Sequence, residues 1–263
     1  LDSVIQLLHG SKDGMPEPFE FVKILTYLDK SDSPIVKENI MMVELLFYNY
    51  IRHDVNLRHF QLFYGILHNP STMLELIKLA WLPDNEQAKE IRKNEFAKNK
   101  NLSSIAKIAL EILHGLEAQP CENNNGVVNG QDLKKYAKEL LEAAKSEYLE
   151  RPAMYVIGKL LGNINLGEDY PPPYLGEILE ELDKDEIDDE YRRQLFNRHG
   201  FTCRAYNEGG TIERKREKKF LSYAEKTRFT YDRITIVFEK LASEYHHMGD
   251  REDVNAKLED LDN

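Results

Sequence analysis

Cysteine is scarce in this 263-residue sequence, and glycine and proline are infrequent. The two cysteines, Cys121 and Cys203, are far apart and lie in dissimilar sequence contexts, which excludes a disulfide framework. Free thiols are typical of a reducing compartment, so we expect the protein to be cytoplasmic. Fourteen Gly and ten Pro are fewer than the frequent turns of a β-sandwich require, whereas 31% charged residues suit helices with solvated faces.

Long hydrophobic runs are also absent. The longest, from Ile40 to Tyr48, contains a glutamate and is about half the length of a membrane-spanning helix. We therefore expect no segment that crosses or anchors in a membrane. The hydrophobic content of 41% nevertheless suffices for buried cores, so extensive disorder is not expected.

The common catalytic and nucleotide-binding motifs are missing as well. The sequence contains no P-loop, GxGxxG, HExxH, GxSxG or CxxC motif and no protein-kinase motif. Basic neighbours would lower the thiol pKa of Cys203, but proximity along the chain does not by itself make a catalytic dyad. We therefore predict that the chain is not an enzyme, with no catalytic residues and no cofactor.

The histidine and carboxylate clusters do not predict a site either. His246 and His247 point about 100° apart on a helix, so they cannot act together as a ligand pair. His246 and Asp250 have a suitable spacing, but we expect Gly249 to end the helix between them. No metal site is therefore predicted. The carboxylates of Glu180–Glu181, Asp183–Asp185 and 188–190 are expected on a solvated acidic edge, where their pKa values stay near the ordinary ones.

Apolar residues recur at helical spacing along nearly the whole chain. Val36 to His53 is apolar over much of its circumference, which is typical of a central helix. Pro83 to Asn101 is strongly charged and is expected to be an exposed helix or a loop. We predict an all-α protein, an irregular stack of about ten helices that forms a pseudo-solenoid or a multi-helix bundle. Phe201 to Tyr206 is the only candidate strand. Other helices are predicted at 3–9, 19–28, 57–67, 72–82, 105–116, 131–148, 153–164, 175–182, 188–197, 211–226 and 229–247.

A loop divides the sequence near its middle. Residues 117–130 contain four asparagines and two glycines, a composition typical of loops. We place a boundary at 119–130, between an N-terminal helical subdomain (1–118) and a C-terminal one (131–263). One continuous fold is the alternative.

The most unusual stretch is basic. From Glu190 to Lys219 the chain has nine Lys and Arg against four Glu, although the whole chain has a net charge of −11. We predict a short arginine helix, an irregular connector and a charged helix starting at Thr211, which together form one positive surface. The candidate contact residues for a partner or an anion are Arg192, Arg193, Arg198, Arg204, Tyr206, Arg214, Lys215 and Arg216.

Three interpretations of this basic stretch stay open. Its charges pair with the acidic remainder of the same chain, as on an ordinary solvated helix. Alternatively, they bind a protein partner. In the third interpretation, a phosphate backbone or nucleotide binds the arginines, between which the aromatic residues Phe201 and Tyr206 are interleaved. Backbone N–H groups after Gly209 and Gly210 form a candidate anion site there, with Thr211 as the helix cap.

Three segments together suggest a family resemblance: NLRHFQLFYGILHNPSTMLELIKLAWLPDNE, RPAMYVIGKLLGNI and YNEGGTIERKREKKFLSYAEKTRFTYDRI. The order of these segments resembles the C-terminal helical region of large multidomain bacterial proteins, most of them uncharacterised. The resemblance extends from about Asn56 to Lys257. It implies that the chain is the C-terminal module of a longer bacterial protein, and it transfers no catalytic residue.

These observations lead to one expected function and two alternatives. We expect a non-catalytic helical interaction or regulatory module that binds a protein partner or another domain of its own chain. Nucleic-acid or nucleotide recognition through the basic patch at 192–219 is the first alternative. The second is an enzyme with a hidden site, which would need a deep pocket with converging titratable groups.

Overall fold

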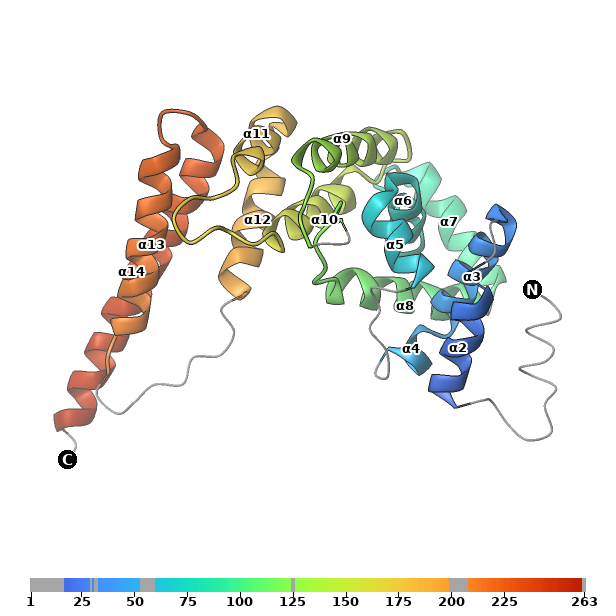
Figure 1. Cartoon of the computed structure of the whole chain (residues 1–263), viewed down its shortest axis with the longest axis horizontal. Helices are drawn as coiled ribbons and strands as arrows, with labels where there is room; N and C mark the ends of the chain where they lie inside the picture. Colours follow the sequence, from blue (N-terminus) through green and yellow to red (C-terminus); the bar gives the residue numbers. More distant parts are fainter. Residues whose placement is uncertain are drawn as a thin grey trace. The chain divides into compact units, whose positions relative to one another are not determined.

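The computed structural model describes residues 17–28, 30, 33–52, 60–123, 126–198 and 208–261 (Figure 1). Within these ranges the chain forms thirteen helices and no strand, apart from one isolated β-bridge between Glu122 and Val128. The all-α prediction is therefore confirmed. The helices are α2 (Pro18–Leu28), α3 (Pro34–Leu46), α4 (Tyr48–Ile51), α5 (Gln61–His68), α6 (Pro70–Ala80), α7 (Glu86–Lys98), α8 (Lys100–Gly115), α9 (Gly130–Ser146), α10 (Glu150–Gly162), α11 (Pro173–Leu182), α12 (Asp185–Asn197), α13 (Thr211–Thr227) and α14 (Asp232–Leu261).

Several helix boundaries differ from the predicted ones. The helix predicted at 36–53 is interrupted at Phe47, whose backbone leaves the helical region with φ −102° and ψ 11°. The charged stretch after Pro83 forms a helix, α7, and the side chain of Asn85 caps its N-terminus by accepting from the Ala88 amide at 3.1 Å. The helix at 3–9 and the strand at 201–206 lie outside the described residues.

The predicted helix end at Gly249 is wrong, because α14 continues through this residue to Leu261. Gly249 is buried against Gly210, which precedes α13. A Cβ atom at Gly210 would lie 2.4 Å from the Gly249 carbonyl oxygen. The glycine pair therefore lets two backbones approach closely, and Gly249 does not stop the helix.

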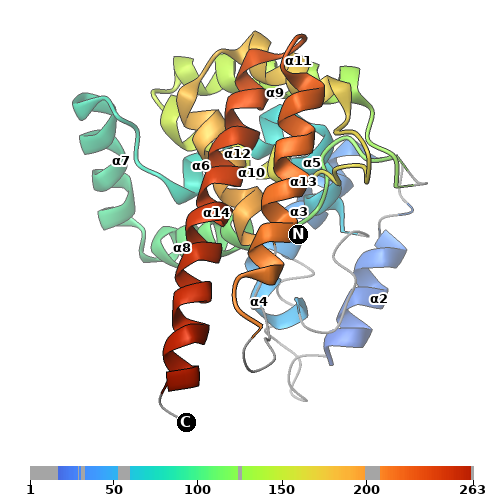
Figure 2. The same ribbon diagram turned by 90° about the vertical axis from the view of Figure 1, so that its left-hand side faces the viewer.

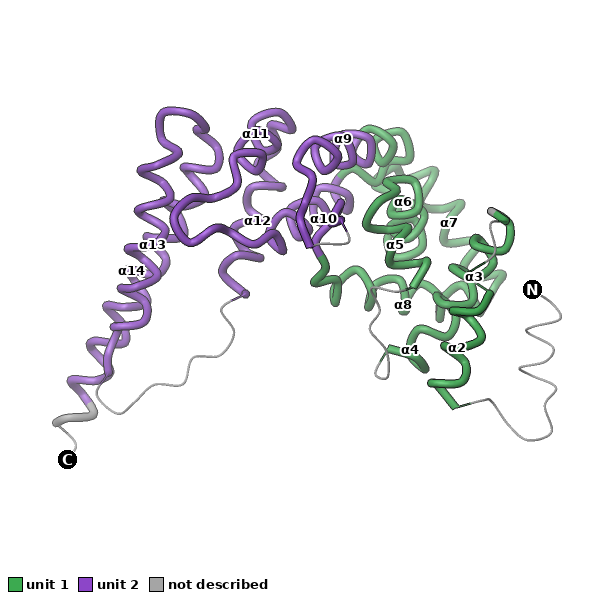
Figure 3. Tube along the Cα trace, viewed as in Figure 1, with its two compact units in different colours: residues 1–118, 142–150 green, residues 119–141, 151–263 purple. Residues whose placement is uncertain are grey.

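The chain divides into two compact units (Figure 3). Unit 1 comprises residues 1–118 and 142–150, and unit 2 comprises residues 119–141 and 151–263. In unit 1, α5, α6 and α8 contribute fully buried apolar side chains, among them Ile66, Met73 and Ile112. Of the helices in the described part of the chain, none is both long and apolar enough to traverse a bilayer.

A buried carboxylate joins two helices of unit 1. Glu44 of α3 is only 3% exposed, and its two oxygens accept hydrogen bonds from the backbone amides of Gln61 (3.2 Å) and Leu62 (2.7 Å). These amides belong to the first turn of α5, where N–H groups have no partner within the helix. The negative charge also complements the positive end of the helix dipole.

In unit 2, α10 is the most enclosed helix, with nine of its thirteen residues buried. Gly158 and Gly162 lie on the side of α10 that meets α12. A Cβ atom at Gly158 would lie 2.7 Å from the Ile187 carbonyl oxygen, and one at Gly162 would lie 2.5 Å from the Gln194 Cβ. The two glycines therefore fix where α12 packs. Helices α13 and α14 form a hairpin, and they lie side by side in both views (Figures 1 and 2).

We predict that Glu44→Ala destabilises unit 1 by about 2–3 kcal/mol, because it leaves the first amides of α5 buried without an acceptor. Amide hydrogen exchange along residues 61–68 is the measurement, with faster exchange expected in the variant. Glu38→Ala is the matched control, since Glu38 is exposed on the same helix. Equal protection of α5 in both variants would contradict the capping role.

Candidate interaction site

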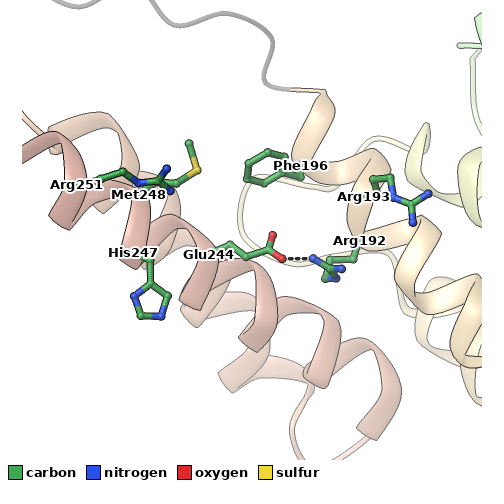
Figure 4. Close-up of a pocket in the computed structure, with 7 residues that line it drawn as sticks. All are labelled: Arg192, Arg193, Phe196, Glu244, His247, Met248 and Arg251. Carbon is green, nitrogen blue, oxygen red and sulfur yellow. Dashed lines mark hydrogen bonds and ion pairs between the residues drawn. The ribbon is translucent and has the colours of Figure 1, made fainter.

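A groove in unit 2 runs between α12 and α14 and has a volume of about 450 Å³ (Figure 4). Its lining combines the apolar side chains of Phe196 and Met248 with three arginines. The lining residues are Arg192, Arg193, Phe196, Glu244, His247, Met248 and Arg251. Two of them, Arg192 and Arg193, are candidate contact residues from the sequence.

An aromatic stack holds the apolar side of this groove in place. The Phe196 ring stacks on Tyr245 of α14, with ring centroids 5.4 Å apart, and Tyr245 stacks on Phe220 of α13 at 5.7 Å. Tyr245 and Phe220 are almost fully buried, whereas Phe196 is half-buried at the groove. Three helices therefore fix the position of Phe196.

The arginines of α12 have intramolecular partners. Arg192 forms an ion pair with Glu244, and Figure 4 shows the two side chains reaching toward each other between the helices. Arg193 pairs with Glu190 one turn earlier and points away from α14 (Figure 4). Arg198 donates hydrogen bonds to the carbonyl oxygens of Gly162 (3.0 Å) and Ile164 (2.8 Å). Arg198 therefore satisfies backbone acceptors at the end of α10.

Arg251 contrasts with these residues. It is exposed and makes no ion pair or hydrogen bond with another residue in the described part of the chain. Figure 4 shows Arg251 and Met248 side by side on the α14 wall of the groove. Arg192 pairs with Glu244 and Arg193 pairs with Glu190, so Arg251 is the one arginine of the lining without an ion pair among the described residues.

The candidate anion site before α13 is filled by the protein itself. The Gly210 amide donates to the Asp253 carboxylate at 2.7 Å. This hydrogen bond and the neighbouring Arg214 guanidinium lower the pKa of Asp253. Thr211 was predicted to cap the helix, but it lies inside α13, and its hydroxyl donates to the Glu208 carbonyl at 2.8 Å.

Arg214 is the centre of a cluster that joins α13 to α14. Its guanidinium binds Glu217 (3.3 Å), Asp250 and Asp253 (3.3 Å), and it contacts the His246 ring at 2.8 Å. The hydrogen bond that Arg214 donates to Asp250 raises the pKa of Arg214, and the same bond lowers the pKa of Asp250. The positive charge of Arg214 is thus neutralised within the chain.

The remaining candidate residues are less constrained or lie elsewhere. Lys215 is exposed and has no ion pair or hydrogen bond among the described residues. The Arg216 guanidinium lies 5.6 Å from the centroid of the Tyr245 ring, a cation–π contact. Arg204 and Tyr206 lie outside the described residues, as do Phe201 and Cys203.

His246 and Asp250 are brought together because α14 continues past Gly249. The His246 Nε2 atom lies 3.5 Å from an Asp250 oxygen, a contact the predicted helix end would have prevented. The Arg214 guanidinium lies where a cation would bind these carboxylates. Among the described residues, no group of three or more His, Cys, Asp and Glu side chains has the arrangement of a metal site.

The expectation of a solvated acidic edge is wrong for two residues of its last run, 188–190. Glu190 is only 6% exposed, and burial raises the pKa of its carboxyl. Asp188 binds Arg233 of α14 at 2.8 Å, and burial raises the pKa of Asp188 to about 6. Arg233 lowers this pKa in turn but does not offset the burial. Asp183 and Asp185 also bind Arg233, so this arginine links the α11–α12 turn to α14.

Sequence reasoning missed the α14 wall of the groove. Glu244, His247, Met248 and Arg251 recur at steps of three and four, which places them on one face of a helix. The predicted helix end at Gly249 hid this pattern, because Arg251 lies beyond the helix predicted at 229–247. Comparison with protein-family models, with curated proteins and with solved structures finds no match for this chain.

We predict that Gly210→Ala destabilises the α13–α14 hairpin by about 2–4 kcal/mol, because its Cβ would collide with the backbone of Gly249. Thermal unfolding followed by circular dichroism measures the loss. The matched control is Gly115→Ala in α8, where an added Cβ meets no atom within 4 Å. This control should change stability by less than about 1 kcal/mol. Similar melting temperatures for the two variants would contradict the close contact.

A second prediction concerns pH. The pKa of Asp188 is raised to about 6 in the folded chain from an ordinary value of 3.8, so the folded state holds this proton more tightly than the unfolded state does. The stabilising contribution of this proton is complete below about pH 4 and is lost as the pH rises through about 6, by roughly 1–3 kcal/mol. Urea unfolding between about pH 4 and pH 7 should show this loss in the wild type but not in Asp188→Asn. Asp189→Asn, on the exposed side of the same helix, should keep the wild-type pH dependence.

Proposed function

We propose that this chain is a non-catalytic helical interaction or regulatory module, and that the groove between α12 and α14 is its contact surface. The partner is another protein or, in line with the resemblance to multidomain bacterial proteins, another domain of the same chain. One observation carries this proposal: a fixed apolar surface at Phe196 and Met248 is bordered by Arg251, which has no partner in the described part of the chain. An apolar centre with a charged border is the common anatomy of a protein interface.

The neutralised basic patch also favours a protein partner over a phosphate backbone. Non-specific nucleic-acid binding depends on cations that are free to replace counterions. Arg192, Arg193 and Arg214 already pair with carboxylates of this chain, and Arg198 binds backbone carbonyls. A phosphate ligand would have to displace these partners, whereas an apolar side chain entering the groove displaces none of them.

The test is affinity capture from cells that express the protein. The 263-residue wild-type chain is immobilised beside the groove variant Met248→Glu/Arg251→Glu, and bound proteins are quantified by mass spectrometry. We expect at least one protein to be captured by the wild type and depleted about tenfold or more on the groove variant. Met248→Glu places a carboxylate where an apolar side chain would be buried, and Arg251→Glu reverses the charge beside it, so both changes weaken the same contact.

The matched control for this capture is Ile236→Glu/Lys145→Glu. Ile236 is an exposed apolar residue of α14, and Lys145 is an exposed lysine without an ion pair among the described residues. The control should retain the captured protein. Loss on both variants, or capture that neither variant affects, would place the contact outside the groove and overturn the proposal.

A further inference from the structure

We infer that the partner inserts an aromatic side chain into the groove between α12 and α14, where the ring contacts Phe196, Met248 and Arg251. This inference rests on the proposed function and specifies the chemistry of the partner. It joins three observations: a stack of rings that ends in the groove, a thioether on the opposite wall, and an arginine that makes no ion pair within the described part of the chain.

The first observation is the ring stack. Phe220, Tyr245 and Phe196 follow one another with ring centroids 5.7 and 5.4 Å apart and interplanar angles of 1° and 26°. The first two rings are almost fully buried, whereas Phe196 is half-buried in the groove lining. Pairs of aromatic rings attract each other at centroid distances of about 4.5–7 Å, beyond what burial alone contributes. A ring from the partner can therefore extend the stack on the exposed part of Phe196.

The second observation is the methionine that faces this stack. Figure 4 shows Phe196 and Met248 on opposite walls of the groove. A thioether sulfur makes favourable contacts with aromatic rings at about 5 Å, and the unbranched methionine side chain adapts to the shape of the ring. The groove volume of about 450 Å³ lies within the range of roughly 300–1,000 Å³ that is usual for small-ligand pockets, so it has room for one ring.

The third observation is electrostatic. Arg251 lies beside Met248, is exposed and makes no ion pair or hydrogen bond among the described residues. The face of an aromatic ring is the negative part of its quadrupole, so a guanidinium stacks on it without needing a carboxylate. The same pair of helices already contains such a contact, because Arg216 of α13 lies 5.6 Å from the centroid of the Tyr245 ring.

A neutral ring also suits the charges around the groove. Arg192 and Arg193 are already paired with Glu244 and Glu190, so they do not call for an anionic partner. Carboxylates outnumber cations in the last turns of α14, and a neutral ring meets no repulsion from them. An aliphatic side chain would gain burial but no attraction to Arg251. An aromatic ring makes favourable contact with all three groups, the phenyl ring, the thioether and the guanidinium.

The experiment compares two probes of similar shape, N-acetyl-phenylalaninamide and N-acetyl-cyclohexylalaninamide. The saturated ring is the more hydrophobic of the two, but it has no π face. The 263-residue wild-type chain carries methionine labelled with carbon-13 in the methyl group, and each probe is titrated by NMR. Met248→Leu identifies the Met248 signal among the six methionines. We expect the Met248 signal to report a dissociation constant about threefold or more lower for the phenyl probe.

Two variants test the groups that select the ring. Arg251→Met removes the cation and should weaken the phenyl probe about threefold while leaving the cyclohexyl probe unchanged. Phe196→Leu should abolish the preference for the phenyl probe. Arg251→Met serves alone if Phe196→Leu fails to fold, because Arg251 is exposed.

The matched control is Lys257→Met, at another exposed cation of α14, which should leave both dissociation constants unchanged. Met42 is an internal control, since it is 46% exposed on α3 of unit 1 and its signal should not shift.

Four outcomes would overturn the inference. The cyclohexyl probe binds as tightly as the phenyl probe, or more tightly. Arg251→Met leaves the phenyl preference unchanged. Neither probe shifts the Met248 signal, or both shift the Met42 signal equally. A single-stranded oligodeoxynucleotide displaces the phenyl probe, which would assign the ring contact to a nucleobase. Any of these outcomes alongside groove-dependent capture from cells would leave the proposed function in place while rejecting an aromatic side chain as the group that enters the groove.

Discussion

The close approach of Gly210 to Gly249 is the contact on which the candidate site depends. It brings the start of α13 against the middle of α14, and there the Gly210 amide meets Asp253 while Arg214 reaches Asp250. Any side chain at Gly210 would separate the two backbones and break both contacts. Because α13 begins at this contact, the last turns of α14 have no turn of α13 beside them. The contact therefore also determines which part of α14 is exposed.

The packing of α14 against α12 and α13 changes how the basic stretch at 192–219 is interpreted. In the sequence, the cations of 192–219 form one patch, and no signal separates those that bind the chain from those that face solvent. In the structure, carboxylates of α12 and α14 pair with Arg192, Arg193 and Arg214. Charged groups that are paired in this way contribute to the folded geometry more than to recognition. The proposed contact surface therefore relies on less conspicuous groups, namely the Phe196 ring, the Met248 thioether and Arg251.

The part of the fold that sequence reasoning predicts correctly is local. Apolar residues at steps of three and four identify a helix because the pattern depends on its own residues alone. Features that depend on distant residues were missed. Gly249 resembles a helix end until Gly210, 39 positions earlier, is known to pack on it. Asp188 resembles a solvated carboxylate until Arg233 is known to cover it. The groove depends on the first of these features, since four of its seven lining residues lie on the helix that was predicted to end too early.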